Sequence, residues 1–354
     1  MHATTVGVDL AKNRFELAIR EGEGRVLRRE RLSRQRFARF FGNFPPSLIV
    51  MEACGSAHYW SRALQAQGHE VRLLPAQYVR AYVKRNKTDA ADAATLLEAA
   101  RCPELRVVPV KSVEQQQLQQ LHRIREQLKH TRTQRINLLR GLLREFGITV
   151  PVGLARGRSA VREALECADN GLPDLLRPMI AETLQEITAL SERITRLEAT
   201  LTALTRPDPI VQRLLELPGV GLLGASALRA AVGDIQRFPS GRHFASWLGL
   251  TASERSSGER RRLGRISKQG DIYLRTLLVH GARSALCAAA KAQREGRALD
   301  RLRTWALATE QRRGRNKATV ALANKLARII WATWRYQRPF NGDWATHATS
   351  NAAG

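Results

Sequence analysis

The first 74 residues alternate short apolar runs with turn residues, a pattern that few folds accommodate. Three strand-like runs come first, separated by short turns: Thr4–Leu10, Phe15–Ile19 and Arg25–Leu32. This spacing predicts an antiparallel meander. Two segments with helical periodicity then alternate with two further strand-like runs, in the order Ser33–Gly42, Leu48–Glu52, Ala57–Gln67 and Glu70–Leu74. The predicted order is therefore three strands followed by helix, strand, helix and strand.

That order predicts an α/β domain with a ribonuclease H-like fold. In such a sheet the first and fourth strands lie side by side. Asp9 comes at the end of the first strand and Glu52 at the end of the fourth. Both follow apolar residues, where a lone carboxylate is costly without a partner. We therefore expect these two carboxylates to face one another.

A second acidic pair begins a predicted helix. Asp89 and Asp92 are three residues apart, which places both carboxylates on one helix face, and Thr88 fits the N-cap position. Four converging carboxylates repel one another unless divalent cations compensate them, and oxygen ligands of this kind suit Mg²⁺ or Mn²⁺. Two such ions promote phosphoryl transfer. Each acid alone also fits a turn or the positive end of a helix, so the combination of the four indicates the metal site.

The charge of the chain indicates a polyanionic partner. There are 58 Lys and Arg residues against 32 Asp and Glu, a net charge of +26. Such an excess attracts nucleic acid through counterion release and long-range steering, although a merely solvated basic surface is the alternative interpretation. A membrane is the competing polyanion, but no run of about eighteen uninterrupted apolar residues occurs. Nucleic acid is therefore the expected partner, with no membrane association.

The cysteines and the first residues indicate the compartment. The cysteines are scattered without the spacing of a zinc site: Cys54, Cys102, Cys167 and Cys287. We interpret them as small buried hydrophobic residues in a reducing compartment, not as disulfides. The chain enters a strand pattern at once, without a charged leader and apolar core. The expected location is the cytoplasm of a prokaryote-like cell, in association with the nucleoid.

The middle of the chain has the periodicity of long helices. Val113–Phe146 is rich in Gln, Arg and Leu, and from Ile187 to Leu204 apolar residues alternate in steps of three and four. The second pattern is a heptad seam of about three heptads. It predicts an antiparallel helical pair or an intermolecular coiled coil, and a helix packed on its own domain is the alternative. Thr149–Asn170, with Pro151 and several glycines, is interpreted as the connection.

A helical, basic unit follows the break at Thr205–Pro209. Its Glu216–Gly221 segment, which runs into the apolar helix Leu222–Ala231, resembles a helix-hairpin-helix element. Gly219 and Gly221 would let backbone amides approach a phosphate at the positive end of that helix. A tight turn between two packed helices is the alternative interpretation.

A serine-containing segment lies further along, between Glu254 and Asp271. Ser256, Ser257 and Gly258 precede a dense set of cationic residues, which suit phosphate binding and transition-state charge. We expect four of these cations to hold the phosphate backbone: Arg260, Arg262, Arg265 and Lys268. A Ser-Ser-Gly sequence taken alone is usually only a loop.

These patterns predict an α/β plus α architecture. The expected divisions are a ribonuclease H-like domain at 1–112, a helical and coiled-coil oligomerisation region at 113–205, a mainly helical DNA-binding domain at 206–340, and a flexible tail at 341–354.

Three motifs of the N-terminal domain resemble those of the DEDD insertion-sequence transposases, the family that also contains the Piv DNA invertase. They are Gly7–Lys12, Glu52–Gly55 and Arg85–Ala93, with Cys54 in place of a more usual Thr. The resemblance covers essentially the whole chain. It implies a RuvC-like catalytic domain whose metal-binding acids are Asp9, Glu52, Asp89 and Asp92.

The resemblance also implies a nucleophile. The family's second domain bears a catalytic serine, which by position here is Ser257, with Ser256 one residue away as the other candidate. A serine hydroxyl is a weak nucleophile and needs activation, which the metal site would supply. The implied product of attack is a DNA-phosphoserine link. The family further implies a noncoding guide RNA, a composite site between subunits, and a homodimer or a dimer of dimers.

Three other functions fit parts of this pattern. A nuclease of the Holliday-junction resolvase kind would use the four acids with water as nucleophile and would not need Ser257. An architectural nucleic-acid-binding protein would bind without metal and cleave nothing. A Piv-type site-specific invertase would share the transposase chemistry and differ only in its DNA sites.

Overall fold

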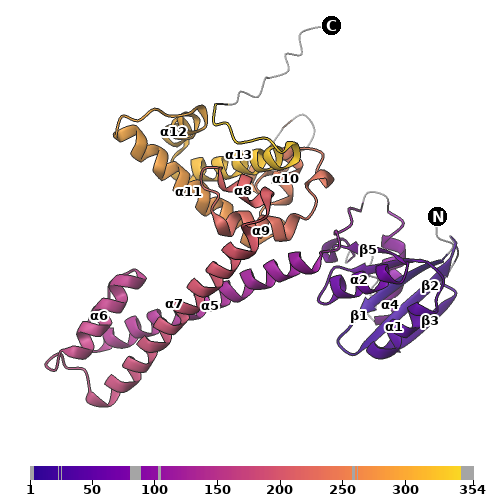
Figure 1. Ribbon diagram of the computed structural model, residues 1–354, viewed down its shortest axis with the longest axis horizontal. Coiled ribbons are helices and arrows are strands. Elements are labelled where there is room, and N and C mark those ends of the chain that lie inside the picture. The colour runs from indigo at the N-terminus through magenta and orange to yellow at the C-terminus, as the bar shows by residue number, and fades with distance from the viewer. Residues whose placement is uncertain are drawn as a thin grey trace, which may run out of the picture. The chain divides into compact units, whose positions relative to one another are not determined.

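The computed structural model describes residues 4–22, 24, 26–79, 89–102, 105–256, 260 and 262–343, with the backbone alone at 89–91. The chain divides after Val113 into two compact units. Each is described by itself (Figure 1).

The first unit is a five-stranded mixed sheet with helices. Its strands are β1 (Thr4–Leu10), β2 (Arg14–Glu21), β3 (Arg28–Ser33), β4 (Leu48–Glu52) and β5 (Glu70–Leu74). Its helices are α1 (Arg34–Gly42), α2 (Ala57–Ala66), α3 (Ala76–Val79) and α4 (Asp89–Ala99). The strand order is β3-β2-β1-β4-β5, with the first three strands antiparallel and β4 parallel to β1. The prediction that the first and fourth strands are neighbours is confirmed.

Strand alternation divides the sheet into two faces. Val8 and Met51 point into a core that includes edge-to-face contacts among Phe15, Phe37 and Trp60. Residues of opposite parity on β1 and β4 point to the other face, where Val50 packs with Leu96 and Ala99 of α4. The first core holds α1 and α2 against the sheet, and the second holds α4.

A glycine permits the close approach of α4 to the sheet. A Cβ atom on Gly7 would lie 2.2 Å from the carbonyl oxygen of Ala93, so the helix backbone occupies the space of a side chain. Further along the helix, Glu98 pairs with Arg20, which lies opposite Thr5 in the β1–β2 register. Helix α4 therefore runs antiparallel to β1, with its first turn toward the end of β1 that carries Asp9.

The second unit contains a long antiparallel helical pair, α5 (Val113–Glu145) and α7 (Arg177–Thr205), which lie side by side in Figure 1. Their register is given by ion pairs: Arg125 contacts Glu198 at 2.6 Å, and ten residues later Arg135 contacts Glu186 at 2.6 Å. Every seventh residue of the predicted seam is buried: Ile187, Ile194 and Leu201. The heptad pattern thus describes an antiparallel pair within one chain.

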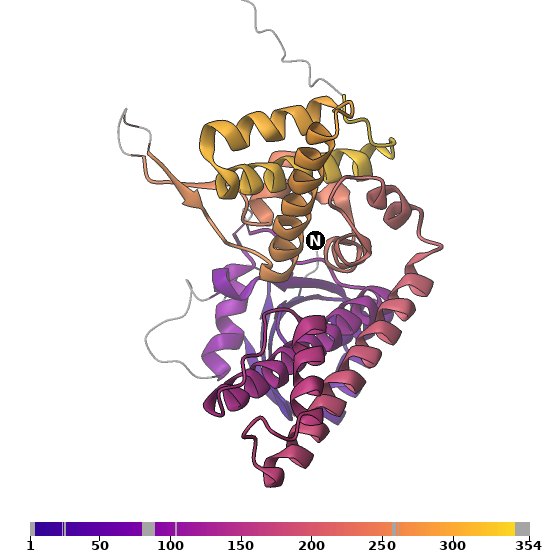
Figure 2. The same ribbon diagram turned by 90° about the vertical axis from the view of Figure 1, so that its left-hand side faces the viewer.

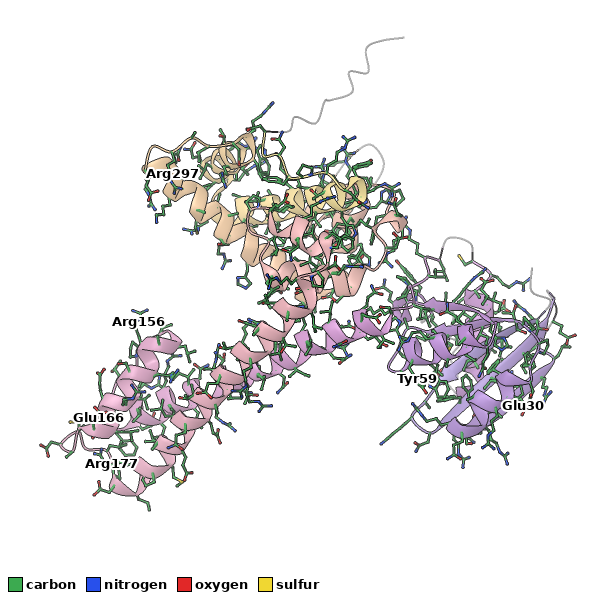
Figure 3. The ribbon with its side chains drawn as sticks, viewed as in Figure 1. Glu30, Tyr59, Arg156, Glu166, Arg177 and Arg297 are labelled. Carbon is green, nitrogen blue, oxygen red and sulfur yellow. The ribbon has the colours of Figure 1, made fainter. Side chains whose placement is uncertain are left out.

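The segment between these helices contains α6 (Leu154–Glu166), where the sequence had indicated only a connection. Val161 of α6 packs with Leu139 of α5 and Ile180 of α7 in a core of their own. Arg177, labelled in Figure 3 near Glu166, fixes this end by donating to the carbonyl of Leu165 at 3.0 Å. The helix was not predicted because the glycines that flank α6 are typical of a loop.

The remainder of the second unit is a helical cluster. It comprises α8 (Pro209–Leu215), α9 (Leu222–Val232), α10 (Gly241–Trp247), α11 (Ile272–Arg294), α12 (Arg301–Arg313) and α13 (Arg315–Tyr336), with a short 3-10 turn at Ile235–Arg237; the other 3-10 turn, Asp174–Leu176, directly precedes α7. On α13, Leu326 and Ile330 are fully buried. Two short strands, β6 (Ala252–Glu254) and β7 (Leu263–Ile266), form an antiparallel hairpin that the sequence did not predict.

The structure also tests two smaller expectations, on the cysteines and on the predicted tail. Cys54 and Cys102 are half-buried, but Cys167 and Cys287 are exposed, so the interpretation of all four as buried residues was wrong. Asn341–Asp343, at the start of the predicted tail, hydrogen-bond to the first turn of α12, and 344–354 lie outside the described residues.

Within the described part of the chain, no helix is both long and apolar enough to span a membrane.

The contact at Gly7 generates a prediction for stability. Gly7→Ala inserts a methyl group where the Ala93 carbonyl lies, so it should lower the free energy of unfolding by about 1–3 kcal/mol. Gly42→Ala, at a helical position with open space around it, is the matched control and should be neutral or slightly stabilising. Urea unfolding of both variants tests this, and equal stability would contradict the close packing of α4.

Candidate catalytic and DNA-binding sites

The first two acids end neighbouring parallel strands. Val8 of β1 lies opposite Met51 of β4, so the next residue along each strand is an acid, Asp9 and Glu52. Both have the parity of Gly7 and Val50 and therefore point to the face that α4 covers. Both side chains are half-buried.

The third acid comes from α4. Asp92 lies in the first turn and immediately precedes Ala93, whose carbonyl contacts the Gly7 position. Its Oδ1 atom is buried and has no hydrogen-bond donor within the described residues. A buried carboxylate oxygen without a donor or a cation is costly, and none of the described residues supplies one to Asp92.

The thiol of Cys54 reports that the strand acids are close together. Its pKa is raised first by burial, then by the negative charge of Glu52 and then by that of Asp9.

Among the described side chains no three His, Cys, Asp or Glu residues are grouped tightly enough to hold a metal ion. The side chain of Asp89, the fourth predicted acid, lies outside the described residues, although its backbone begins α4. The structure thus brings Asp9, Glu52 and Asp92 to one face of one sheet without closing a ligand shell.

The serine segment belongs to the β6–β7 hairpin, which extends away from the helical cluster in Figure 2. Ser256 follows β6, and its hydroxyl donates to Glu254 at 2.8 Å while accepting the backbone amide of Arg262 at 3.2 Å. These bonds tie Ser256 to the hairpin itself. Ser257 lies outside the described residues, so its geometry stays a prediction.

Two glycines hold the base of this hairpin against the helical cluster. Gly249 has φ 69° and Gly270 has φ 85°, and a Cβ on either would lie 2.0 Å from a backbone carbonyl, of Gln269 and Trp247 respectively. Only glycine fits both the backbone conformation and the space. The backbone amide of Lys268 donates to Gly249 at 3.1 Å, so the two ends of the serine segment are joined directly.

The predicted phosphate contacts lie on or beside this hairpin. All four are exposed: Arg260, Arg262, Arg265 and Lys268. Lys268 has a left-handed backbone, φ 56°, which is uncommon for a residue with a side chain. The hairpin therefore presents these cations to solvent.

The predicted helix-hairpin-helix element falls on the turn between α8 and α9. The Val220 amide donates to the Leu217 carbonyl, and Gly221, which is exposed, directly precedes α9. Gly219, with φ 82°, packs against Gly281 of α11, where a Cβ would lie 2.3 Å from a carbonyl oxygen. Gly219 therefore has a packing role in the turn, and phosphate binding by Gly219 and Gly221 stays a prediction.

Sequence reasoning missed a buried polar network that ties α5 to the helical cluster. The ring of His122, on α5, contacts Tyr273 Oη through Nδ1 and Ser226 Oγ through Nε2, both at 3.0 Å. The Ser226 hydroxyl donates to the Leu222 carbonyl, so it accepts from Nε2–H. A neutral imidazole completes the network by accepting the Tyr273 hydroxyl at Nδ1. A lone His, Ser and Tyr, each on a different helix, give no signal in the sequence.

Comparison with known proteins identifies the class. A transposase family model of the DEDD, IS110 type matches residues 6–148, and a model described as transposase of the IS116/IS110/IS902 family matches residues 211–297. The acids on the sheet lie in the first segment and the serine hairpin in the second.

Curated relatives extend the match over nearly the whole chain. A probable family 20 transposase of Pseudomonas aeruginosa is 45% identical, covering 94% of this chain and 97% of its own length. The transposase for insertion sequence element IS1111A of Coxiella burnetii is 38% identical over 95% and 90%, and that for IS1328 of Yersinia enterocolitica is 36% identical over 93% and 96%. The chain belongs to the IS116/IS110/IS902 family of transposases, enzymes that recombine DNA.

The His122 network predicts a pH dependence of stability. Burial, followed by the charge of Arg125, lowers the pKa of His122 to about 4 from an ordinary 6.5. A base whose pKa is lowered by folding contributes fully to the stability of the folded protein at pH values above its pKa in the unfolded chain. That contribution is lost as the pH falls toward its pKa in the folded protein. Between about pH 7.5 and pH 5 the loss should be about 2 kcal/mol.

Urea unfolding at the two pH values measures this. In His122→Gln the loss between them should shrink by that amount. His130→Gln, which removes an exposed histidine of the same helix, should keep the wild-type pH dependence. An unchanged pH dependence in His122→Gln would show that His122 is not held neutral.

Proposed function

We propose that this transposase cuts and rejoins DNA with a metal site formed by Asp9, Glu52, Asp89 and Asp92 and with Ser257 as the nucleophile. The single observation that carries the proposal is the buried Oδ1 of Asp92, which has no hydrogen-bond partner among the described residues and lies on the sheet face shared by Asp9 and Glu52. Without a cation these carboxylates would repel one another and leave a buried oxygen unsatisfied.

A ribonuclease H-like, RuvC-like fold for the N-terminal domain is part of this proposal. The strand order β3-β2-β1-β4-β5, with an antiparallel meander followed by two parallel strands, supports it. In this arrangement the strand acids and the first turn of α4 meet at the carboxyl ends of β1 and β4. The positive end of α4 also favours negative charge there.

The donor set fits a hard divalent cation. It consists of carboxylates alone, which suits Mg²⁺ or Mn²⁺ better than softer metals. When bound, such ions would favour ionisation of the attacking hydroxyl and stabilise the charge that develops on the leaving oxygen. The four carboxylates hold the cations.

The serine step conserves the phosphodiester energy. The Oγ of Ser257 attacks phosphorus, a P–Oγ bond forms, and the bond between phosphorus and one sugar oxygen breaks. The proton lost by the serine balances the one gained by the freed sugar hydroxyl. Attack by the hydroxyl of another strand then reverses the reaction and joins the new strand without an external energy source.

The remaining surfaces would position the nucleic acid. The exposed cations beside the serine segment, Arg260, Arg262, Arg265 and Lys268, would neutralise backbone phosphates, and the turn containing Gly219 and Gly221 would offer amides to another. A noncoding guide RNA, as the family resemblance implies, would recognise the DNA sequence by base pairing. The protein would then recognise only the shape of the nucleic-acid backbone. The net charge of +26 supports binding of both DNA and RNA. The natural setting would be the prokaryotic nucleoid.

Assembly of two or four copies completes the proposal. In the family picture the acids of one subunit and the serine of another form a composite site, so a homodimer or a dimer of dimers would be the active form. The antiparallel α5–α7 pair, within the proposed 113–205 region, offers its remaining exposed apolar residues to such contacts, among them Leu138 and Met179.

Trapping of the covalent protein–DNA adduct tests the nucleophile. Wild type, Ser257→Ala, Ser256→Ala and Asp9→Asn are incubated with Mg²⁺, element-end DNA and co-purifying RNA, and separated on denaturing gels. The adduct should disappear in Ser257→Ala and Asp9→Asn and persist in Ser256→Ala. Cleavage that survives Ser257→Ala without any adduct would instead assign the reaction to a nuclease that uses water.

Binding of Mn²⁺ to the full-length protein tests the metal site separately. Asp92→Asn removes a charge from the buried carboxylate and should weaken Mn²⁺ binding by about tenfold or more in calorimetric titration. Glu98→Gln, on the same helix but paired with Arg20, is the matched control and should bind Mn²⁺ as wild type does. Equal affinities in the two variants would remove Asp92 from the metal site.

A further inference from the structure

The helical cluster contains a cavity that the proposed reaction does not use. It has a volume of about 590 Å³ and opens between α5, α9 and the first turn of α11, all within the second unit. Its volume is sufficient for a small planar group. The His122–Tyr273 pair lies in its wall, where both ring nitrogens of the histidine are already hydrogen-bonded.

One wall of the cavity is apolar and is formed mainly by small side chains. It consists of three small side chains of α9, Ala227, Ala230 and Ala231, of which Ala231 is only half-buried. Ile272 of α11 also lines the cavity and is 71% exposed, although it is large and apolar. Flat apolar surface of this kind suits the face of a ring.

The opposite wall, on α5, is rich in groups that both donate and accept hydrogen bonds. Gln119 and Gln127 each carry an amide, and Arg123 and His130 are exposed beside them. Amides pair well with the edges of nucleobases, which also combine donors and acceptors.

The charge of the lining argues against a phosphate inside. Glu126 and Asp271 both line the cavity, and the Asp271 carboxylate caps α11 by accepting the Leu274 amide. Glu126 is paired with Arg125 and Lys129, and Arg123 also lines the cavity, so the repulsion of a phosphate rests on Asp271, whereas a neutral base is not repelled. The cations lie nearby in the chain instead, because Lys268 is only three residues before Asp271.

We propose that this cavity binds one unpaired nucleobase of the nucleic acid whose backbone is held by the β6–β7 hairpin. The base stacks on Ala231 of α9 and on Ile272 and pairs at its edge with the glutamines of α5. Its phosphates stay outside, toward Arg265 and Lys268. The inference rests on the proposed function in one respect, that the hairpin cations hold a phosphate backbone.

Binding of single-stranded oligonucleotides to the full-length protein tests this. The probes are oligothymidine and an abasic oligomer of equal length and charge, compared by fluorescence anisotropy at one salt concentration. Wild type should bind oligothymidine about tenfold more tightly, because stacking is lost with the bases. Oligouridine of the same length is the third probe and tells whether DNA or RNA supplies the base.

Two variants assign the preference to the cavity. Ala231→Leu fills it from a half-buried position, and Gln127→Ala removes an edge partner, so both should lose most of the tenfold preference and keep abasic binding. Gln120→Ala, an exposed glutamine of α5 outside the cavity, should keep the preference. Thermal unfolding confirms that the variants are folded.

The outcomes separate the two proposals. A preference for bases that is unchanged in Ala231→Leu and Gln127→Ala overturns the cavity assignment and leaves the transposase reaction intact. Equal wild-type binding of oligothymidine, oligouridine and abasic oligomer overturns it as well. If no oligomer binds, the phosphate-binding role proposed for the hairpin fails together with the cavity.

Discussion

The contact between α4 and β1 at Gly7 is the constraint on which the acidic site depends. Helix and strand backbones approach so closely there that a carbonyl oxygen occupies the position of a side chain. Because the helix runs antiparallel to the strand, this one contact also fixes which end of α4 reaches Asp9. A larger residue at position 7 would lift the first turn, and with it Asp92, from the strand acids. The site thus depends on a residue that carries no functional group.

Close backbone contacts at glycines also occur in the second unit, where they support loops. Gly249 and Gly270 let two backbone segments touch at the base of the β6–β7 hairpin, and Gly219 packs against Gly281 below the α8–α9 turn. In each case a loop that carries the predicted phosphate contacts is fixed to a buried helical core. Fixed supports of this kind lower the entropy lost when a loop binds a backbone.

Local patterns predicted the sheet well, and contacts distant in sequence were not predictable. The strands carrying Asp9 and Glu52 alternate or are uniformly apolar, so their ends could be identified, and the facing of the two acids followed from the strand order. By contrast, the glycines flanking α6 suggested a loop, and strands of three and four residues, as in the β6–β7 hairpin, are too short for an alternating pattern to be recognised. The His122 network joins residues 104 and 151 positions apart, and no single-sequence pattern encodes such a distance. Ser256 and Ser257 differ by one position, a difference that spacing alone does not resolve.

The antiparallel pairing of α5 with α7 has a consequence for how such chains can vary in length. At 1.5 Å per residue the 33 residues of α5 span about 50 Å, and the ion pairs at Arg125 and Arg135 hold α7 in register along it. A residue added to one helix alone would rotate every later side chain by about 100° and break that register. Lengthening must therefore occur in both helices together and in whole heptads. Insertions and deletions in this part of the chain are expected in matched pairs that lie opposite one another in space, as residues 51 positions apart do at Arg135–Glu186 and residues 73 positions apart do at Arg125–Glu198.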